Sequence, residues 1–150
     1  MARAPGEVII QTFVPHHYAI QRAVAHDADG FYKQELHMRE MLRFPPFHRL
    51  LLARFSGADP ARVRERAGRL AALLRDKAAR GNTWRAVAVY GPVPCPIARI
   101  KDRARWQVLL RGQTPSLMRG LLMAALEEYE KDKKRAGVAV TLDMDPVDLL

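Results

Sequence analysis

The 150-residue chain has only one cysteine, no long apolar run and no signal-peptide pattern at its start. Its one cysteine excludes an internal disulfide and a structural zinc site of the multi-cysteine kind. No apolar run approaches the roughly 20 residues that a membrane-spanning helix needs. The first ten residues, MARAPGEVII, lack the apolar core and cleavage site of a secretory signal peptide. These absences predict a soluble, cytoplasmic protein that has no membrane partner.

Acidic residues are also few for a chain this rich in basic ones. Lys and Arg number 25 and Asp and Glu number 16, which gives a formal net charge of +9. Such a balance indicates a polyanionic partner, either a nucleic acid or an anionic surface. Hydrophobic residues make up 49% of the chain, so it can bury a real core and is not disordered by composition.

The excess charge is confined to one part of the chain. Residues 1–46 hold five basic and five acidic residues, whereas residues 47–150 hold 20 basic and 11 acidic ones. The change in charge coincides with Pro45-Pro46. The residue before a proline is pushed out of the helical region, so a double proline ends a helix and restarts the chain in an extended form. We therefore predict a neutral segment over 1–46 and a basic domain over 47–150.

The neutral segment has the pattern of a short strand followed by two helices. An apolar run at 8–10, flanked by a Pro-Gly pair and polar residues, predicts a buried strand. Helical spacing of apolar residues follows over 16–26 and again over 30–44. Between them, Asp27 and Gly30 belong to a turn with helix-capping chemistry.

The basic domain has alternating strand and helix signals. Helices are predicted from Asp59-Pro60 to residue 80 and from Thr114-Pro115 to a solvated basic end at 131–135. Strands are predicted over 48–55, 85–90, 97–100, 105–110 and 138–144, with the proline-rich residues 91–96 as a stiff, extended loop. With the two short stretches beside that loop, 85–90 and 97–100, counted as one strand, the order is β-α-β-β-α-β, typical of the α+β ferredoxin-like (split βαβ) fold, an antiparallel sheet with two helices on one face.

No catalytic or metal-binding residue is predicted. The chain has no Gly-rich phosphate-binding loop, its histidines lack metal-ligand spacing, and Cys95 has no evident base beside it. Asp143 and Asp145 lie two apart on the last predicted strand, where paired carboxylates can hold a divalent metal. The pattern favours the simpler interpretation, a strand-end turn at Asp145-Pro146. We therefore expect no cofactor.

The strongest functional signal is a basic stretch with one large aromatic. On a hairpin, alternate residues project to one face, so Arg99, Lys101, Arg103 and Arg105 would form a row of cations if no bulge intervenes. Trp106 would offer a stacking surface to the opposite face or to the edge. Cations for phosphate and an aromatic for bases are the ingredients of single-stranded nucleic-acid binding. The simpler alternative is a solubilising hairpin with Trp106 in the core, and the arginine-rich 60–80 helix is best explained as a solvated face.

Several short motifs in a fixed order carry a family resemblance. They are PGEVIIQT at 5–12, FY at 31–32, EL at 35–36 with Arg39, PPF at 45–47, GPVP at 91–94, PI at 96–97, RWQVLL at 105–110 and DMDP at 143–146. Each is weak alone, but the series resembles the C-terminal part of the bacterial replication-restart helicases of the PriA (primosomal protein N′) family, over nearly the whole chain.

The resemblance implies a C-terminal piece of a longer, ATP-dependent 3′–5′ DNA helicase that acts in replication restart and primosome assembly at stalled forks. Residues 1–46 would then hold the end of the second helicase lobe and a connecting helix. ATP, magnesium and zinc would bind upstream in the parent, and this piece would have no enzymatic activity. The implied partners are single-stranded or forked DNA, the single-strand DNA-binding protein and primosome proteins.

Two other interpretations stay open at this point. The basic surface would serve equally well to dock an acidic peptide, such as the tail of the single-strand DNA-binding protein. Leu117 and Leu121 fall where some members of the family have polar or basic contacts, so that pocket is not carried over. An RNA-binding module is the third interpretation, because small βαββαβ domains often bind RNA, but no pair of aromatics has the spacing that such sheets use.

Overall fold

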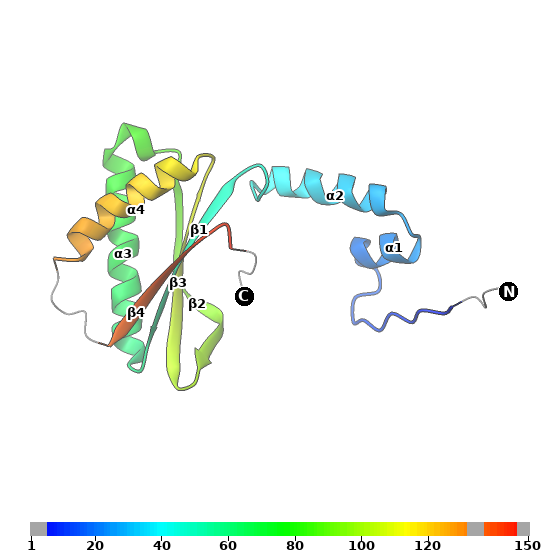
Figure 1. Ribbon diagram of the computed structural model, residues 1–150, viewed down its shortest axis with the longest axis horizontal. Coiled ribbons are helices and arrows are strands. Elements are labelled where there is room, and N and C mark those ends of the chain that lie inside the picture. The colour runs from blue at the N-terminus through cyan, green and yellow to red at the C-terminus, as the bar shows by residue number, and fades with distance from the viewer. Residues whose placement is uncertain (1–5, 132–136, 147–150) are drawn as a thin grey trace. The chain divides into compact units, whose positions relative to one another are not determined.

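The computed structural model describes residues 6–131 and 137–146, and the chain divides into two units, residues 1–41 and 42–150 (Figure 1). The division comes just before the double proline from which the sequence boundary was predicted. No helix in the described residues has the length and apolar character to cross a membrane.

The described residues of the first unit include two helices, α1 (Tyr18–Val24) and α2 (Ala28–Met41). Asp27 lies between them, and its Oδ1 accepts a hydrogen bond from the backbone N–H of Gly30 at 2.8 Å. This bond satisfies one of the donors that the first turn of α2 leaves free, which is the capping role predicted for the turn. Neither helix contains a buried residue.

The strand predicted over residues 8–10 is wrong. Residues 6–12 have no regular secondary structure, and Val8 and Ile9 are 86% and 85% exposed. A strand needs a neighbour to take up its backbone hydrogen bonds. No strand among the described residues pairs with this stretch, so its apolar residues do not form part of a sheet.

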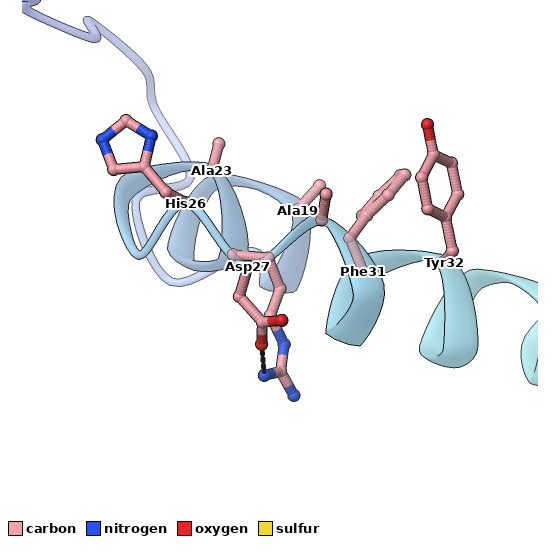
Figure 2. Close-up of a pocket in the computed structure, with 8 residues that line it drawn as sticks. Ala19, Ala23, His26, Asp27, Phe31 and Tyr32 are labelled. Atoms are coloured by element: carbon pink, nitrogen blue, oxygen red, sulfur yellow. Dashed lines mark hydrogen bonds and ion pairs between the residues drawn. The ribbon is translucent and has the colours of Figure 1, made fainter.

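The first unit also holds a shallow cavity of about 410 Å³ at the turn between its helices. Figure 2 shows Phe31 and Tyr32 projecting from α2, with Ala19 of α1 beside Phe31, Ala23 near His26, and Asp27 turned to the ion pair that it makes with Arg22. The lining is apolar apart from that pair and one histidine. Nothing in it combines a nucleophile with a base, so we do not assign it a chemical role.

Two ion-paired carboxylates make the helix pair sensitive to acid. Hydrogen bonds from the Gly30 backbone and from Arg22 lower the pKa of Asp27 below 3.8, and those from Tyr18 and Arg39 lower the pKa of Glu35 below 4.5. A lowered folded-state pKa contributes stability above the ordinary value, and that contribution is lost as pH falls through the lowered one.

We therefore expect α1 and α2 to lose order on the acid side, below about pH 4.5, and to keep it through neutral pH. Amide chemical shifts of residues 18–41 followed by NMR during a pH titration will check this. The Asp27→Asn/Glu35→Gln variant should show no such acid transition. An equal transition in that variant would mean that other groups cause it.

The second unit confirms the predicted βαββαβ order. Its elements are β1 (Arg49–Gly57), α3 (Pro60–Arg80), the short 3-10 helix η1 (Asn82–Trp84), β2 (Ala88–Ile100), β3 (Arg103–Gly112), α4 (Pro115–Tyr129) and β4 (Val138–Met144). The strands form one sheet in the order β2-β3-β1-β4, and every neighbouring pair is antiparallel. Figure 1 shows α3 and α4 together on one side of this sheet. The basic end predicted for α4 falls largely on residues 132–135, which lie outside the described residues.

The core lies between the sheet and these two helices. Alternate residues of β1 point at the helices, and the largest of them, Phe55, is fully buried. Helix α3 begins where predicted because Asp59 Oδ1 accepts from the N–H groups of Ala61 and Arg62, with Pro60 at the first helical position. Its buried stripe meets the sheet with Val63, Leu70 and Leu74.

The loop predicted over residues 91–96 is instead part of a strand. β2 runs through it from Ala88 to Ile100, with register shifts between Tyr90 and Val93 and between Pro94 and Arg99. β2 is an edge strand that pairs with β3 alone, so its prolines, which lack N–H groups, remove no bond to a second neighbour. The segment is extended, as its prolines require, but it belongs to the sheet.

Asp145 closes the sheet as a turn residue, the role that the sequence favours. Its backbone N–H donates to the carbonyl of Leu50 at 2.7 Å, its Oδ1 accepts from the Leu50 N–H at 3.1 Å, and its Oδ2 pairs with Arg49. No group of acidic, histidine or cysteine side chains in the described residues could hold a metal ion.

We expect Asp145→Ala to lower the free energy of unfolding by about 1–3 kcal/mol, because the Leu50 N–H loses its acceptor. Urea unfolding of the full chain, followed by the fluorescence of Trp84 and Trp106, measures the change. Asp143→Ala, at an exposed strand position, is the matched control and should stay within about 0.5 kcal/mol of the parent chain. Equal losses in the two variants would contradict the role of Asp145.

Candidate nucleic-acid interface

The face of the sheet turned away from α3 and α4 is rich in arginine. On β3 the residues that alternate with the buried Ala104, Val108 and Leu110 point to this side. These residues include Arg103, Arg105 and Arg111. Arg54 of β1 lies on the same side, because it is the cross-strand partner of Gln107. We call this surface the arginine face, and it consists of Arg54, Tyr90, Val93, Arg103, Arg105, Gln107, Leu109 and Arg111. From β4, Asp143 is the cross-strand partner of Leu52 on this side.

The predicted row of four cations on one side of the hairpin is not formed. Arg103 and Arg105 share the arginine face, but Arg99 is paired with Ala104 and so belongs to the opposite side. Lys101 lies in the two-residue turn with Asp102, where both have positive φ angles, 47° and 59°. The register shift after Pro94 and this tight turn break the alternation.

Arg99 is held near the turn by an ion pair with Asp102, at 3.3 Å between Nη2 and Oδ1. Its side chain is 64% exposed. Arg99 and Lys101 therefore lie at the tip of the hairpin with Arg103, although they do not continue its row. The tip still concentrates three cations within five residues, against the single carboxylate of Asp102.

Trp106 lies on the helix side of the sheet. It is paired with Phe55 in the β1–β3 ladder, packs in part against the hydrophobic core, and has the guanidinium carbon of Arg64 5.7 Å from its ring centroid. The geometry favours the core interpretation of this residue over a stacking platform for bases. Arg64 gains a cation–π contact from the same arrangement.

The two arginines of the β3 row are oriented by backbone carbonyls. Arg103 Nη2 donates to the carbonyl of Ser56 at 3.0 Å, and Arg105 Nη1 donates to that of Ile97 at 3.3 Å. A guanidinium carries five N–H donors, so each of these bonds leaves donors for a phosphate. Both groups are thus positioned before any ligand arrives, which lowers the entropic cost of binding.

Cys95 lies beside these arginines in the irregular part of β2. Burial raises the pKa of its thiol, and the nearby positive charges of Arg105 and Arg54 oppose that rise. The side chain is 3% exposed. A buried thiol with a raised pKa is a poor nucleophile at neutral pH, which agrees with a packing role.

Tyr90 and Arg111 form the other end of the arginine face. The guanidinium carbon of Arg111 lies 5.0 Å from the Tyr90 ring centroid, and its Nη1 donates to the carbonyl of Leu42 at 2.9 Å. Tyr90 is nevertheless 42% exposed. This pair and Arg54 are not among the residues predicted from the sequence, although alternation along β1 and β3 places Arg54 and Arg111 opposite the buried positions.

Gln107 lies in the middle of the same face. Its Oε1 is buried and has no hydrogen-bond partner in the part of the chain that the structure describes. Buried acceptors are normally satisfied, so one without a donor on a surface of this kind merits a functional explanation.

Comparison with known proteins gives a consistent picture. Residues 40–147 match the family model of the primosomal protein N C-terminal domain. The replication restart protein PriA of Bacillus subtilis strain 168 is 34% identical over 142 residues, which cover 95% of this chain and 17% of that protein. The protein of the same name from Synechocystis is 35% identical over 145 residues, covering 97% of this chain and 16% of the relative. That from Treponema pallidum is 36% identical, with 97% and 21% covered.

Proposed function

Because the chain belongs to the family of the primosomal protein N C-terminal domain, we propose that it is the DNA-binding C-terminal module of a PriA-type replication-restart helicase. The chain spans at most 21% of the length of the three relatives compared, so the ATP-dependent 3′–5′ helicase activity is proposed for the parent protein. In that protein, ATP, magnesium and zinc would bind outside this chain. The module itself would position single-stranded or forked DNA while a primosome assembles.

The arginine face is the observation that carries this proposal. Arg54, Arg105 and Arg111 project from adjacent strands, and Arg103 extends the row toward the hairpin tip. Against them the register places one carboxylate, Asp143, on the same side of β4. Four cations against one carboxylate suit a phosphate backbone, because binding releases the counterions condensed on the nucleic acid.

The test is the variant with alanine at Arg99, Lys101, Arg103 and Arg105. We expect its affinity for single-stranded and forked DNA to fall on the order of 100-fold at moderate salt. The slope of log K against log salt should decrease by about 0.7 for each phosphate contact removed from a single strand. Fluorescence anisotropy with labelled DNA over a salt series measures both, and circular dichroism confirms that the variant is folded.

Two results would refute the proposal. The first is a folded variant that binds DNA as the parent chain does. The second is an acidic peptide that binds the parent chain while DNA does not, which would support the docking alternative instead. ATP hydrolysis by the purified chain would separately contradict the expectation that the module has no enzymatic activity.

A further inference from the structure

The arginine face combines two kinds of surface that a duplex-binding patch does not need together. Near the hairpin tip it is cationic, with Arg103 and Arg105. Toward the other end of β3 it holds apolar side chains from edge strand β2, where Tyr90 is 42% and Val93 is 48% exposed. Duplex DNA presents phosphates outward and keeps its base faces stacked inside, so an exposed ring on a protein surface has no base face to stack on.

We propose, building on the proposed function, that the arginine face is a single-strand site in which a base stacks on Tyr90 while Arg103 and Arg105 hold the phosphates. Base stacking on an aromatic side chain tolerates any sequence, because every base has a π-face. At about 3.3 Å per residue, Arg103 and Arg111 lie about 26 Å apart along β3, which accommodates several nucleotides of an extended strand.

The Arg111 guanidinium prepares the ring for this role. It lies against the Tyr90 ring and is itself tied to the Leu42 carbonyl, so the ring is held in place without being covered completely. A side chain already fixed in its bound position loses little entropy when a base arrives. Gln107, between the aromatic and cationic ends, has an Oε1 that the described residues leave without a donor, and base edges carry N–H donors.

Charge decides the class of occupant. The face holds four arginines, three along β3 and Arg54 beside them on β1, and this number of cations suits a partner with repeating anions. An acidic peptide would satisfy the cations, but its carboxylate side chains have no flat ring that could stack on Tyr90. We therefore assign single-stranded nucleic acid to this face and treat peptide binding as a contrary outcome of the test.

The experiment compares Tyr90→Leu with the parent chain on two probes, an oligothymidine of about 15 nucleotides and a blunt duplex of similar length. We expect the variant to bind the oligothymidine about tenfold more weakly, with an unchanged salt slope, and to bind the duplex within about twofold of the parent. Tyr90→Phe, which keeps the ring, should bind as the parent does. Tyr32→Leu removes a 61% exposed tyrosine of α2 and is the matched control, expected to change neither affinity.

A measurement on the unaltered chain guards against a misfolded variant. An oligonucleotide carrying 5-bromouracil should cross-link to Tyr90 under ultraviolet light, as mapped by mass spectrometry. Full oligothymidine binding by folded Tyr90→Leu, or no cross-link at Tyr90, overturns this inference and leaves DNA binding by the hairpin cations standing. Equal losses on both probes overturn the single-strand preference. Displacement of the oligothymidine by an acidic peptide of equal charge at lower concentration overturns the assigned occupant.

Discussion

Replacing Tyr129 by alanine is expected to lower the free energy of unfolding of the second unit by about 3–5 kcal/mol, the range measured for deleting a buried aromatic. Tyr129 ends α4 and is 3% exposed. Its ring lies 4.0 Å from the guanidinium carbon of Arg66, and its hydroxyl accepts from Arg66 Nε at 3.0 Å. The substitution therefore opens a cavity and also removes two contacts from a buried cation.

The burial of Arg66 adds to the expected loss of stability. Arg66 is 3% exposed on α3, and the loss of contacts costs far more for a buried charge than for an exposed one. Native proteins typically have a free energy of unfolding of about 5–15 kcal/mol, so this loss would remove a large share of it.

Tyr129→Phe separates the two contributions. It keeps the ring and removes only the hydroxyl acceptor, so we expect a loss of about 1–2 kcal/mol. Urea unfolding followed by Trp84 and Trp106, both in the second unit, gives each value, and Tyr32→Ala at an exposed position should be nearly neutral. A loss below about 1 kcal/mol in Tyr129→Ala would mean that the contact with Arg66 is not a significant source of stability.

Most of the second unit follows from local signals in the sequence. Helix α3 has its full predicted bounds, because Asp59 and Pro60 mark its start and an apolar stripe continues to Arg80. β4 is likewise found over 138–144, ahead of an Asp-Pro step. Each of these signals involves only residues that are close in the sequence, and at these residues the local structural preference agrees with the burial pattern of the fold.

The failures come from features that depend on a partner. The apolar run at 8–10 has the composition of a strand, but composition cannot supply a neighbouring strand. The prolines of β2 exclude a central strand and leave an edge strand or a loop, and the choice depends on whether β3 lies alongside. Sheet order is a long-range property, so local pattern could not decide either case.

The site was predictable in part for the same reason. Its location on the 99–106 hairpin required only charge and alternation. The assignment of each side chain to a face required the register, which the shift after Pro94 and the turn at Lys101 and Asp102 change. Arg54 joins the face only through its pairing with Gln107 in another strand, a contact between residues 53 positions apart.

Charge-reversal variants can distinguish a localised DNA site from the general attraction of DNA to a chain of net charge +9. Arg103→Glu/Arg105→Glu places two negative charges on the arginine face, and we expect its affinity for single-stranded DNA to fall on the order of 1000-fold at low salt. Arg85→Glu/Arg119→Glu makes the same change in net charge at two exposed positions outside that face. If long-range attraction alone governed binding, both double variants would lose the same amount of affinity for DNA.

A site on the arginine face predicts unequal losses, with the control pair weakened about tenfold or less, because charges beyond a Debye length of about 10 Å are largely screened at 0.1 M salt. Anisotropy titrations at two salt concentrations separate the contributions. Raising the salt should shrink the loss in the control pair toward zero. The loss in the arginine-face pair should also shrink, because each phosphate contact removed lowers the salt slope, but this pair should stay measurably weaker than the control pair. If the two double variants lose the same affinity as each other at each salt concentration, the net charge, and not this face, governs binding.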